Sequence, residues 1–359
     1  MKKRYTYKLR PGKTAQHSLN QQYATCRWIW NQCVEVFNKR ENTNQTSLMK
    51  QVTTWRKEHE WLRDQPVVPQ QQIVRDFITA KKAFFNKIRK APRFKSKRIH
   101  KPSLNYTTRG FSITKAGRLK LAGNIVIPVV WSRNLPSEPS SVRVFKDSCG
   151  DWWASFVVDT EPQTRSRDND GQIGIDWGVK TPATTSRPGF DLGYTPRVKE
   201  NAKALAKYQR RMARLKAKQE WEKYRKAKKK KAKLERRVKR QRREQSRKWA
   251  QHVARHNKTV AVEDFKSTFL FKKKNMAKKS ADIGIGIAKR ELISACQTFG
   301  SDVFVIDPHY TTMDCSNCGT RAKAKLDLGT RVFHCDFCGT TIDRDVNAAR
   351  NMLLRAGFN

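Results

Sequence analysis

The spacing of apolar side chains in the first part of the chain switches between two periods. Residues 3–9 place aromatic or aliphatic side chains at alternate positions, which predicts a short strand that ends before Pro11-Gly12. Apolar side chains then recur every three or four positions, which is the period of an amphipathic helix. The segments with this period cover residues 14–39, 46–62 and 70–89, with a break at 66–69. We therefore expect a helical module of three helices inserted after the first strand.

From residue 103 to residue 159 the period returns to two, in short segments separated by turn residues. The strands expected there cover residues 111–113, 119–121, 125–127, 142–145 and 152–158, the last two as a hairpin. Strands of this length and spacing are typical of a small barrel, which the N-terminal strand could join. Residues 162–171 are polar and charged, which indicates a linker.

The second half contains apolar strands that end in an acid. Residues 173–176 end in Asp176 and residues 258–263 end in Glu263. On its own, an Asp at the end of a strand is more often a turn residue. The other elements expected here are a strand at 181–185, an amphipathic helix at 284–299, a further buried strand at 303–307, and a last helix from Asp345 with Asp343 or Arg344 near its N-cap.

A long basic helical region separates the two acid-tipped strands. Its apolar positions repeat at helical spacing from residue 198 to residue 257, but a lysine run interrupts them. We therefore expect two helices in an antiparallel pair, with the tip near Lys228, Lys229, Lys230 and Lys231. A solvated hairpin is the plain alternative. Contact with nucleic acid is favoured, because lysines at this density repel one another unless phosphates are near.

The charge of the chain points to a polyanionic partner. It has 77 Lys and Arg against 31 Asp and Glu, a net charge of +46, and nucleic acid is the commonest partner for such a surplus. A ribosomal type of basic protein would not need spaced acids, and an anionic membrane is disfavoured because the aromatics are spread along the chain. The basic loop with Arg93, Lys95 and Lys97 is expected to contact phosphates, with a solvated loop as the alternative.

No uncharged apolar stretch is long enough to cross a membrane, and the basic N-terminus lacks the apolar run of a signal peptide. Of eight cysteines, four have the spacing of metal ligands and four are scattered in apolar surroundings. A reducing, cytoplasmic compartment therefore fits better than an oxidising one.

Two Cys-x-x-Cys pairs form the strongest local motif. The pairs are Cys315 with Cys318 and Cys335 with Cys338, and sixteen residues separate the two pairs. Four thiolates at this spacing suit one tetrahedral Zn²⁺ and leave no open position, so the site is expected to be structural. His334 is then a neighbour of the site and not a ligand.

The acids suggest a second, different metal site. If the strands before Asp176 and Glu263 lie in one parallel sheet, both carboxylates meet at its carboxyl edge, and Asp345 arrives at a helix N-terminus. Three carboxylates brought together repel one another unless cations lie between them. Two Mg²⁺ ions would satisfy these acids and would stabilise both the attacking and the leaving oxygen in phosphodiester hydrolysis.

These motifs together resemble the TnpB family, which are RNA-guided nucleases encoded by insertion sequences and related to type V CRISPR effectors. The matching segments are Gly174-Ile175-Asp176-Trp177-Gly178-Val179-Lys180, Val262-Glu263-Asp264-Phe265, Asp307-Pro308-His309-Tyr310-Thr311-Thr312 and Asp343-Arg344-Asp345-Val346-Asn347-Ala348-Ala349-Arg350-Asn351. The N-terminal half matches in pattern, notably at Pro92-Arg93-Phe94-Lys95-Ser96-Lys97. The likeness covers essentially the whole chain. One departure is Asp314, where the family usually has a neutral polar residue.

The resemblance implies an α/β multidomain fold with an RNase H-like RuvC nuclease domain. A wedge β-barrel would comprise residues 1–12 and 91–162, and a helical recognition module residues 13–90. The nuclease domain would comprise residues 172–310 and 341–359, including a basic helical hairpin at 198–257. A zinc ribbon that binds the target nucleic acid would occupy residues 311–340.

The resemblance also implies Asp176, Glu263 and Asp345 as catalytic acids. Asp345 is chosen over Asp343 because it heads the D-x-N-A-A pattern. It implies a guide RNA from the transposon end, a short motif beside the target, cleavage of double-stranded DNA and a monomeric protein in the ribonucleoprotein. Two alternatives stay open. One is an RNA-guided DNA-binding regulator without nuclease activity, and the other is a transposase or transposase accessory protein that acts without RNA.

The adjacent DNA motif would be read by the helical module and the barrel. Gln pairs with adenine and Arg with guanine in the major groove, which makes one set of polar residues candidates. They are Gln70, Gln71, Gln72, Arg75 and Thr107. An exposed polar helix face explains the glutamines equally well.

Overall fold

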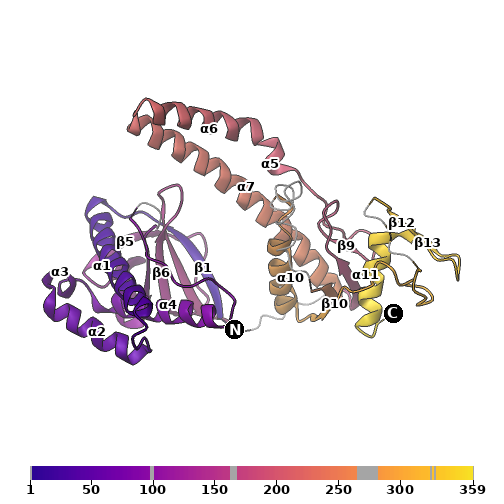
Figure 1. Ribbon diagram of the computed structural model, residues 1–359, viewed down its shortest axis with the longest axis horizontal. Helices are drawn as coiled ribbons and strands as arrows, with labels where there is room; N and C mark the ends of the chain where they lie inside the picture. The colour runs from indigo at the N-terminus through magenta and orange to yellow at the C-terminus, as the bar shows by residue number, and fades with distance from the viewer. Residues whose placement is uncertain are drawn as a thin grey trace. The chain divides into compact units, whose positions relative to one another are not determined.

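Two units, Met1–Glu161 and Pro162–Asn359, make up the chain in the computed structural model (Figure 1). Each unit has its own hydrophobic core. The structure describes residues 2–97, 101–161, 168–264, 282–323, 326 and 329–358. Within these ranges, no helix combines the length and the apolar character needed to span a bilayer.

A seven-stranded antiparallel sheet frames the first unit. Its strands are β1 (Lys2–Leu9), β2 (Ser103–Thr107), β3 (Phe111–Ile113), β4 (Arg118–Leu121), β5 (Ile125–Val130), β6 (Pro139–Lys146) and β7 (Trp152–Asp159). The order β2-β6-β7-β1-β5-β4-β3 places the N-terminal strand in the middle. The 3-10 helix η1 (Thr108–Gly110) joins the two edge strands, β2 and β3, directly. The sheet therefore curls almost into a closed barrel.

The helices that follow β1 pack against this sheet. They are α1 (Lys13–Asn38), α2 (Gln45–Glu58), α3 (Glu60–Arg63) and α4 (Val67–Phe85). Leu19 of α1 and Phe77 of α4 share one core with Phe156 of β7. Helices and sheet therefore bury each other's apolar faces and fold as one unit.

The break expected at residues 66–69 is instead the start of α4. Pro66 is the N-cap residue and Pro69 lies in the first turn of the helix. The first turn has no partner for its backbone N–H groups, so a proline costs nothing there.

A second, smaller sheet organises the other unit. Its strands are β8 (Gly171–Asp176), β9 (Thr184–Thr185), β10 (Asn257–Glu263) and β11 (Asp302–Ile306), in the order β11-β10-β8-β9. β8, β10 and β11 are parallel, and β9 is antiparallel to β8. The carboxyl ends of the three parallel strands therefore lie along one edge.

Helices cover both faces of this sheet (Figure 1). α7 (Trp221–His256) and α10 (Ile285–Phe299) pack on one face, where Val253 and Leu292 meet Val262. α11 (Arg344–Arg355) packs on the other, where Met352 meets Ala261. Successive residues of β10 thus point to opposite faces, and the unit is a three-layer α/β arrangement.

The remaining elements of this unit are α5 (Arg197–Glu200), α6 (Ala202–Ala217) and the hairpin of β12 (Val332–His334) and β13 (Thr341–Asp343). α6 and α7 form the expected helical pair, but its tip was placed wrongly. The turn lies at Lys218–Glu220, where Gln219 has φ +56°, and the lysine run lies inside α7. Lysine is a good helix former, so the run interrupts the apolar pattern without interrupting the helix.

Two strand expectations are also corrected. β11 is not a buried strand: Val305 is 54% exposed and Phe304 is 36% exposed, because β11 is an edge strand that pairs only with β10. The strand expected at 181–185 is reduced to Thr184–Thr185.

Gly174 allows α11 to approach β8 closely. A Cβ at this position would lie 1.8 Å from the carbonyl oxygen of Ala349. We predict that Gly174→Ala lowers the free energy of unfolding by about 2–3 kcal/mol, because backbone and not a flexible side chain must move. Thermal unfolding followed by circular dichroism measures this.

Gly286→Ala is the matched control, because a Cβ at Gly286 meets nothing within 4 Å. This substitution lies in α10 and should leave stability unchanged or raise it by about 0.5–1 kcal/mol. Equal melting temperatures for the two variants would show that α11 is not held against β8 as described.

Candidate active site and metal centre

Two of the three expected catalytic acids lie side by side at the carboxyl edge of the parallel strands. Asp176 ends β8 and Glu263 ends β10, and the residues before them, Ile175 and Val262, are register partners. The Trp177 N–H donates a hydrogen bond to Glu263 Oε2 at 3.4 Å. Burial raises the pKa of Glu263 to about 7.

The N-terminus of α11 brings Asp345 to the same edge. Asp343 is the N-cap residue, and its Oδ1 accepts hydrogen bonds from the N–H groups of Asp345 (2.9 Å) and Val346 (3.2 Å). Burial, followed by the charges of Glu263 and Asp345, holds the pKa of Asp176 well above its usual range. The carboxylates of Glu263 and Asp345 are therefore close enough to affect Asp176, and the three acids come from three separate elements.

Two arginines contact Asp345, and the sequence patterns did not predict them. Arg331 Nη1 lies 3.0 Å from Oδ2, and Arg344 Nη2 lies 3.1 Å from Oδ1. Arg331 precedes β12 and reaches Asp345 because β12 pairs with β13, which runs directly into α11. The contact between Arg331 and Asp345 could have been predicted only from the register of the β12–β13 hairpin.

The acid cluster has the chemistry of a site for a hard cation. Carboxylate oxygens are the ligands that Mg²⁺ prefers, and a divalent ion would offset both the burial and the neighbouring negative charges that raise the pKa of Asp176. The three carboxylates are more widely spaced than the four cysteine sulfurs. Among the described residues, only those sulfurs form a group of at least three metal-ligand atoms that all lie within 4.8 Å of one another.

The four cysteines of the expected zinc site come together. Cys315 Sγ lies 3.7 Å from Cys338 Sγ, and Cys318 Sγ lies 3.6 Å from Cys335 Sγ. A tetrahedron with Zn–S bonds of about 2.3 Å has sulfur–sulfur edges of about 3.8 Å. The donor set and its spacing therefore fit one Zn²⁺.

The two cysteine pairs have the same local structure. Gly319 N–H donates to the Cys315 carbonyl and Gly339 N–H to the Cys335 carbonyl, both at 2.9 Å, and both glycines have positive φ. The Thr340 hydroxyl lowers the pKa of Cys338 to about 5, which favours the thiolate that a metal needs. His334 bonds to the Thr341 hydroxyl at 2.9 Å.

One face of α11 ties the ribbon to the helix that carries Asp345. Asn347 Nδ2 donates to the Asp314 carbonyl at 2.8 Å, and Asn351 Nδ2 donates to the Thr311 carbonyl at 2.8 Å. Arg355 Nη2 contacts the Asp314 carboxylate at 2.7 Å. Asn347 and Asn351 are buried, and the three residues are four apart, so they line one face. The sequence patterns did not predict this function for them.

The candidates for DNA-motif contact lie in the first unit, and one of them is wrong. Gln70 is fully buried, donates to the Leu62 carbonyl at 2.8 Å and accepts from Arg56 at 2.8 Å. A buried polar side chain with its partners in place is structural. It therefore cannot contact DNA without unfolding the helices around it.

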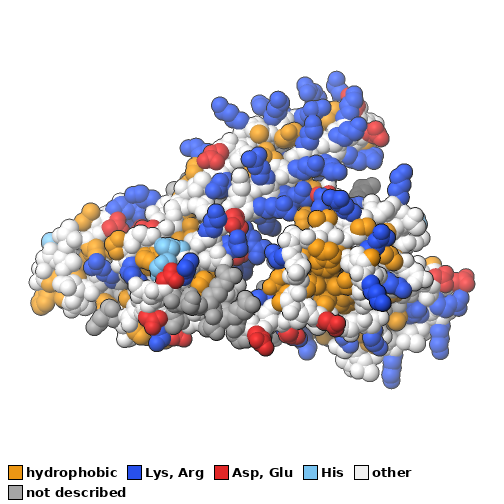
Figure 2. Space-filling model, turned by 180° about the vertical axis from the view of Figure 1, so that it is seen from behind, with side chains coloured by type: hydrophobic (Ala, Val, Ile, Leu, Met, Phe, Trp, Pro, Cys, Tyr) orange, Lys and Arg blue, Asp and Glu red, His pale blue; other side chains and the backbone are white. Residues whose placement is uncertain are grey.

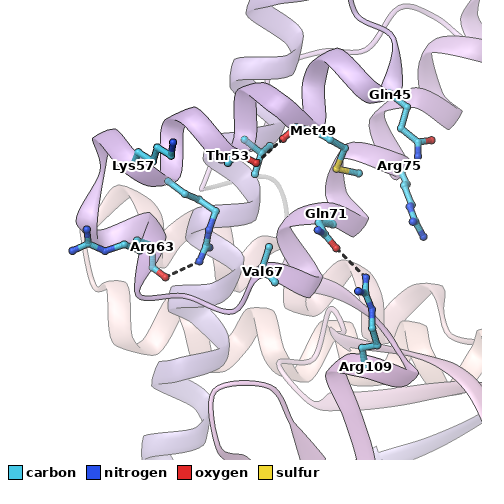
Figure 3. Close-up of a pocket in the computed structure, with 11 residues that line it drawn as sticks. Gln45, Met49, Thr53, Lys57, Arg63, Val67, Gln71, Arg75 and Arg109 are labelled. Atoms are coloured by element: carbon cyan, nitrogen blue, oxygen red, sulfur yellow. Dashed lines mark hydrogen bonds between the residues drawn. The ribbon is translucent and has the colours of Figure 1, made fainter.

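Gln71 and Arg75 line a cavity of about 580 Å³ between α2 and α4, where Arg109 Nη2 lies 3.4 Å from Gln71 Oε1 (Figure 3). Gln72 and Thr107 are half-buried. The lining also includes Arg56, Lys57 and Arg63, so the cavity is strongly basic.

The loop at residues 91–97 is anchored and not free. Trp30 Nε1 donates to the Arg93 carbonyl at 2.9 Å, and Asn31 Oδ1 accepts from the Lys95 N–H at 2.7 Å. Lys95 Nζ lies 3.4 Å from the centre of the Trp30 ring, and burial lowers its pKa to about 8. Lys95 therefore packs inward, against expectation, whereas Arg93 and Lys97 are exposed.

The basic hairpin presents its lysines to solvent. Lys228, Lys229 and Lys230 are exposed, and Lys231 is half-buried beside Glu235. Figure 2 shows Lys and Arg side chains crowded over α6 and α7. This surface has the charge that a phosphate backbone requires.

Three family models match separate segments. Residues 288–352 match "Cas12f1-like, TNB domain", residues 155–274 match "Probable transposase", and residues 1–45 match "Helix-turn-helix domain". In this structure, residues 1–45 contain β1 and α1.

Two curated proteins are similar along nearly the whole chain. A Streptomyces pristinaespiralis protein, named as an inferred RNA-guided DNA endonuclease, is 30% identical over 98% of this chain and 89% of its own length. Escherichia coli InsQ, named in the same way, is 28% identical over 97% and 91%. A solved Cas12f1–sgRNA–target DNA complex aligns with TM-score 0.57 over 98% of each chain, at 12% identity, and supports the fold.

The raised pKa of Glu263 predicts a stability change with pH in magnesium-free buffer. The pKa of this carboxyl group is about 7 in the folded protein and 4.5 in the unfolded chain. As the pH rises from 4.5 to about 7, the unfolded chain releases this proton more readily, so the free energy of unfolding falls. Glu263→Gln should therefore be more stable than the wild type by about 2 kcal/mol at a pH of about 8, but not at a pH of about 4.

Thermal unfolding at the two pH values measures this difference. Added Mg²⁺ should raise the melting temperature of the wild type more than that of the variant. A variant without the extra stability at the higher pH would contradict the described burial of Glu263.

Zinc content provides a separate test of the ribbon. We predict about one zinc ion per chain, and less than about 0.2 in Cys335→Ser, because three thiolates do not close the tetrahedron. Inductively coupled plasma mass spectrometry measures both. Cys149→Ser is the control, since this buried thiol lies in the first unit and should leave the zinc content unchanged.

Proposed function

The chain belongs to the TnpB family of proteins encoded by IS605-type insertion sequences, and from this we propose that it is an RNA-guided DNA endonuclease. The observation that carries the proposal is the acid cluster. Asp176, Glu263 and Asp345 arrive from β8, β10 and α11 at one sheet edge, in a chain of net charge +46. A merely basic binding protein has no use for three carboxylates that repel one another.

We propose that these three acids hold two Mg²⁺ ions. When bound, the ions supply an activated water and stabilise the leaving oxygen of a phosphodiester. The carboxylates of Asp176 and Glu263 supply ligands from the rigid sheet, and Asp345 supplies ligands from the first turn of α11. Arg331 and Arg344, which contact Asp345, are placed to take up phosphate charge next to it.

The two units support a division of tasks. We assign residues 1–12 and 91–162 to a wedge barrel and residues 13–90 to a recognition module that reads a short DNA motif. Residues 172–310 and 341–359 form the RuvC nuclease domain. The basic cavity with Gln71 and Arg75 supports motif reading by α4, and the near-closed sheet supports the barrel. Residues 311–340 form the ribbon, in which Zn²⁺ on four thiolates has a structural role.

The proposed partners are a guide RNA from the transposon end and double-stranded target DNA. Base pairing with the guide would supply sequence specificity, and the basic surfaces would bind the phosphate backbones. The exposed lysines of α7 and the exposed Arg93 and Lys97 support this role. We propose one protein per ribonucleoprotein.

A regulator without nuclease activity is the alternative, and one variant separates the two functions. Asp176→Asn keeps the shape of the side chain but removes a metal ligand. We predict that it lowers the rate of Mg²⁺-dependent cleavage of a guide-matched duplex by about 1,000-fold or more. Binding to the same duplex should be retained, as measured by filter binding with the copurified RNA.

Asp302→Asn is the matched control. Asp302 lies in the same sheet, at the amino end of β11, and is exposed. It should cleave at the wild-type rate. Wild-type protein that binds the matched duplex but does not cut it would support the regulator, and undiminished cleavage by Asp176→Asn would refute the acid site.

A further inference from the structure

Tyr310 is an exposed aromatic residue in the segment that leads from β11 to the first cysteine pair. Ile306, the last residue of β11, is the register partner of Glu263. Tyr310 follows four residues later, so its Cα lies within about 14 Å of Ile306. The residue is 51% exposed, so about half of its surface is available for contact with a ligand.

The backbone of Tyr310 is in a conformation that bulky residues avoid. Its φ is +63°, in the left-handed region, where glycine and asparagine are the usual residues. The Tyr310 carbonyl accepts hydrogen bonds from Met313 N–H (2.8 Å) and Asp314 N–H (2.9 Å), which hold this turn. A strained aromatic residue that packing does not require is a feature of functional sites.

A fixed guanidinium covers one face of the Tyr310 ring. The Cζ of Arg321 lies 3.9 Å from the ring centre. Arg321 is itself held by Asp314, with Nε 2.7 Å from Oδ1 and Nη2 3.3 Å from Oδ2, and Asp314 is held in turn by Arg355 of α11. These contacts restrict the ring, which the neighbouring His309 ring also approaches at 6.3 Å between centroids, and the residue is still about half exposed.

We propose that Tyr310 is a stacking platform for one unpaired nucleobase of a nucleic-acid strand at the acid site. The inference rests on the proposed function and adds a binding residue to that site. Every base has a π-face, so the contact would not depend on sequence, and a preorganised ring loses little entropy on binding. Arg321 supplies positive charge next to the same ring.

Three variants of the full-length protein test the platform. Tyr310→Asn removes the ring but suits a positive φ, whereas Tyr310→Phe and Tyr310→Trp keep an aromatic face. Affinity is measured for single-stranded DNA and single-stranded RNA oligonucleotides that carry a fluorescent purine analogue, at several salt concentrations.

The expected result is about ten-fold weaker binding by Tyr310→Asn, with an unchanged slope of log affinity against log salt, because no phosphate contact is lost. Tyr310→Phe and Tyr310→Trp should bind within about two-fold of wild type, because both keep an aromatic face. Comparison of the DNA and RNA oligonucleotides identifies which strand supplies the base. Val305→Thr, which changes an exposed apolar residue in β11, is the control and should bind like wild type.

Wild-type affinity and quenching in Tyr310→Asn would overturn the proposal. Weak binding by Tyr310→Trp would overturn it as well, which keeps the test valid if the Asn variant folds poorly. Failure of the two proposals is distinguishable. Guided cleavage with no dependence of strand binding on Tyr310 rejects the platform alone, and ring-dependent strand binding without guided cleavage rejects the nuclease alone.

Discussion

The close contact between α11 and β8 determines where chemistry can occur in this chain. With no side chain at Gly174, the backbone at Ala349 can lie directly on the strand. The helix then runs so that Asp345, one turn earlier, reaches the end of the strand at Asp176. Because neither element carries a complete site, an acid cluster exists only while this contact is made.

The same helix joins two sites of opposite chemistry. At the sheet edge, burial and the neighbouring carboxylates raise the pKa of Asp176, which suits a hard divalent cation or a guanidinium. In the ribbon, four sulfur atoms at tetrahedral spacing suit a softer metal cation. β13 runs straight into α11, and Asn347, Asn351 and Arg355 bind the other end of the ribbon. The segment that holds the four cysteines is therefore attached to α11 at both of its ends.

Local patterns predicted much of this structure and failed in a consistent way. The parallel strands that end in Asp176 and Glu263, the helix at 285–299 and the four cysteines follow from periods and spacings. The predictions were wrong for the tip of the basic hairpin and for the burial of β11. They were also wrong in placing Gln70 and Lys95 at the surface. In each of these, a residue's type suggested its surroundings, but its neighbours in space decided them.

The sequence by itself determined which donor atoms are available and along which elements they lie. The spacing of the four cysteines predicts a metal cluster because these residues are close in the chain, and the two-residue period of a strand predicts which residues share a face. Only the tertiary structure decided which side chains contact these predicted features: Arg331 and Arg344 on Asp345, Arg321 over Tyr310, and Asn347 and Asn351 on the chain before Cys315. Such meetings depend on strand register and helix packing, which arise from interactions summed over the whole unit and leave no local signal.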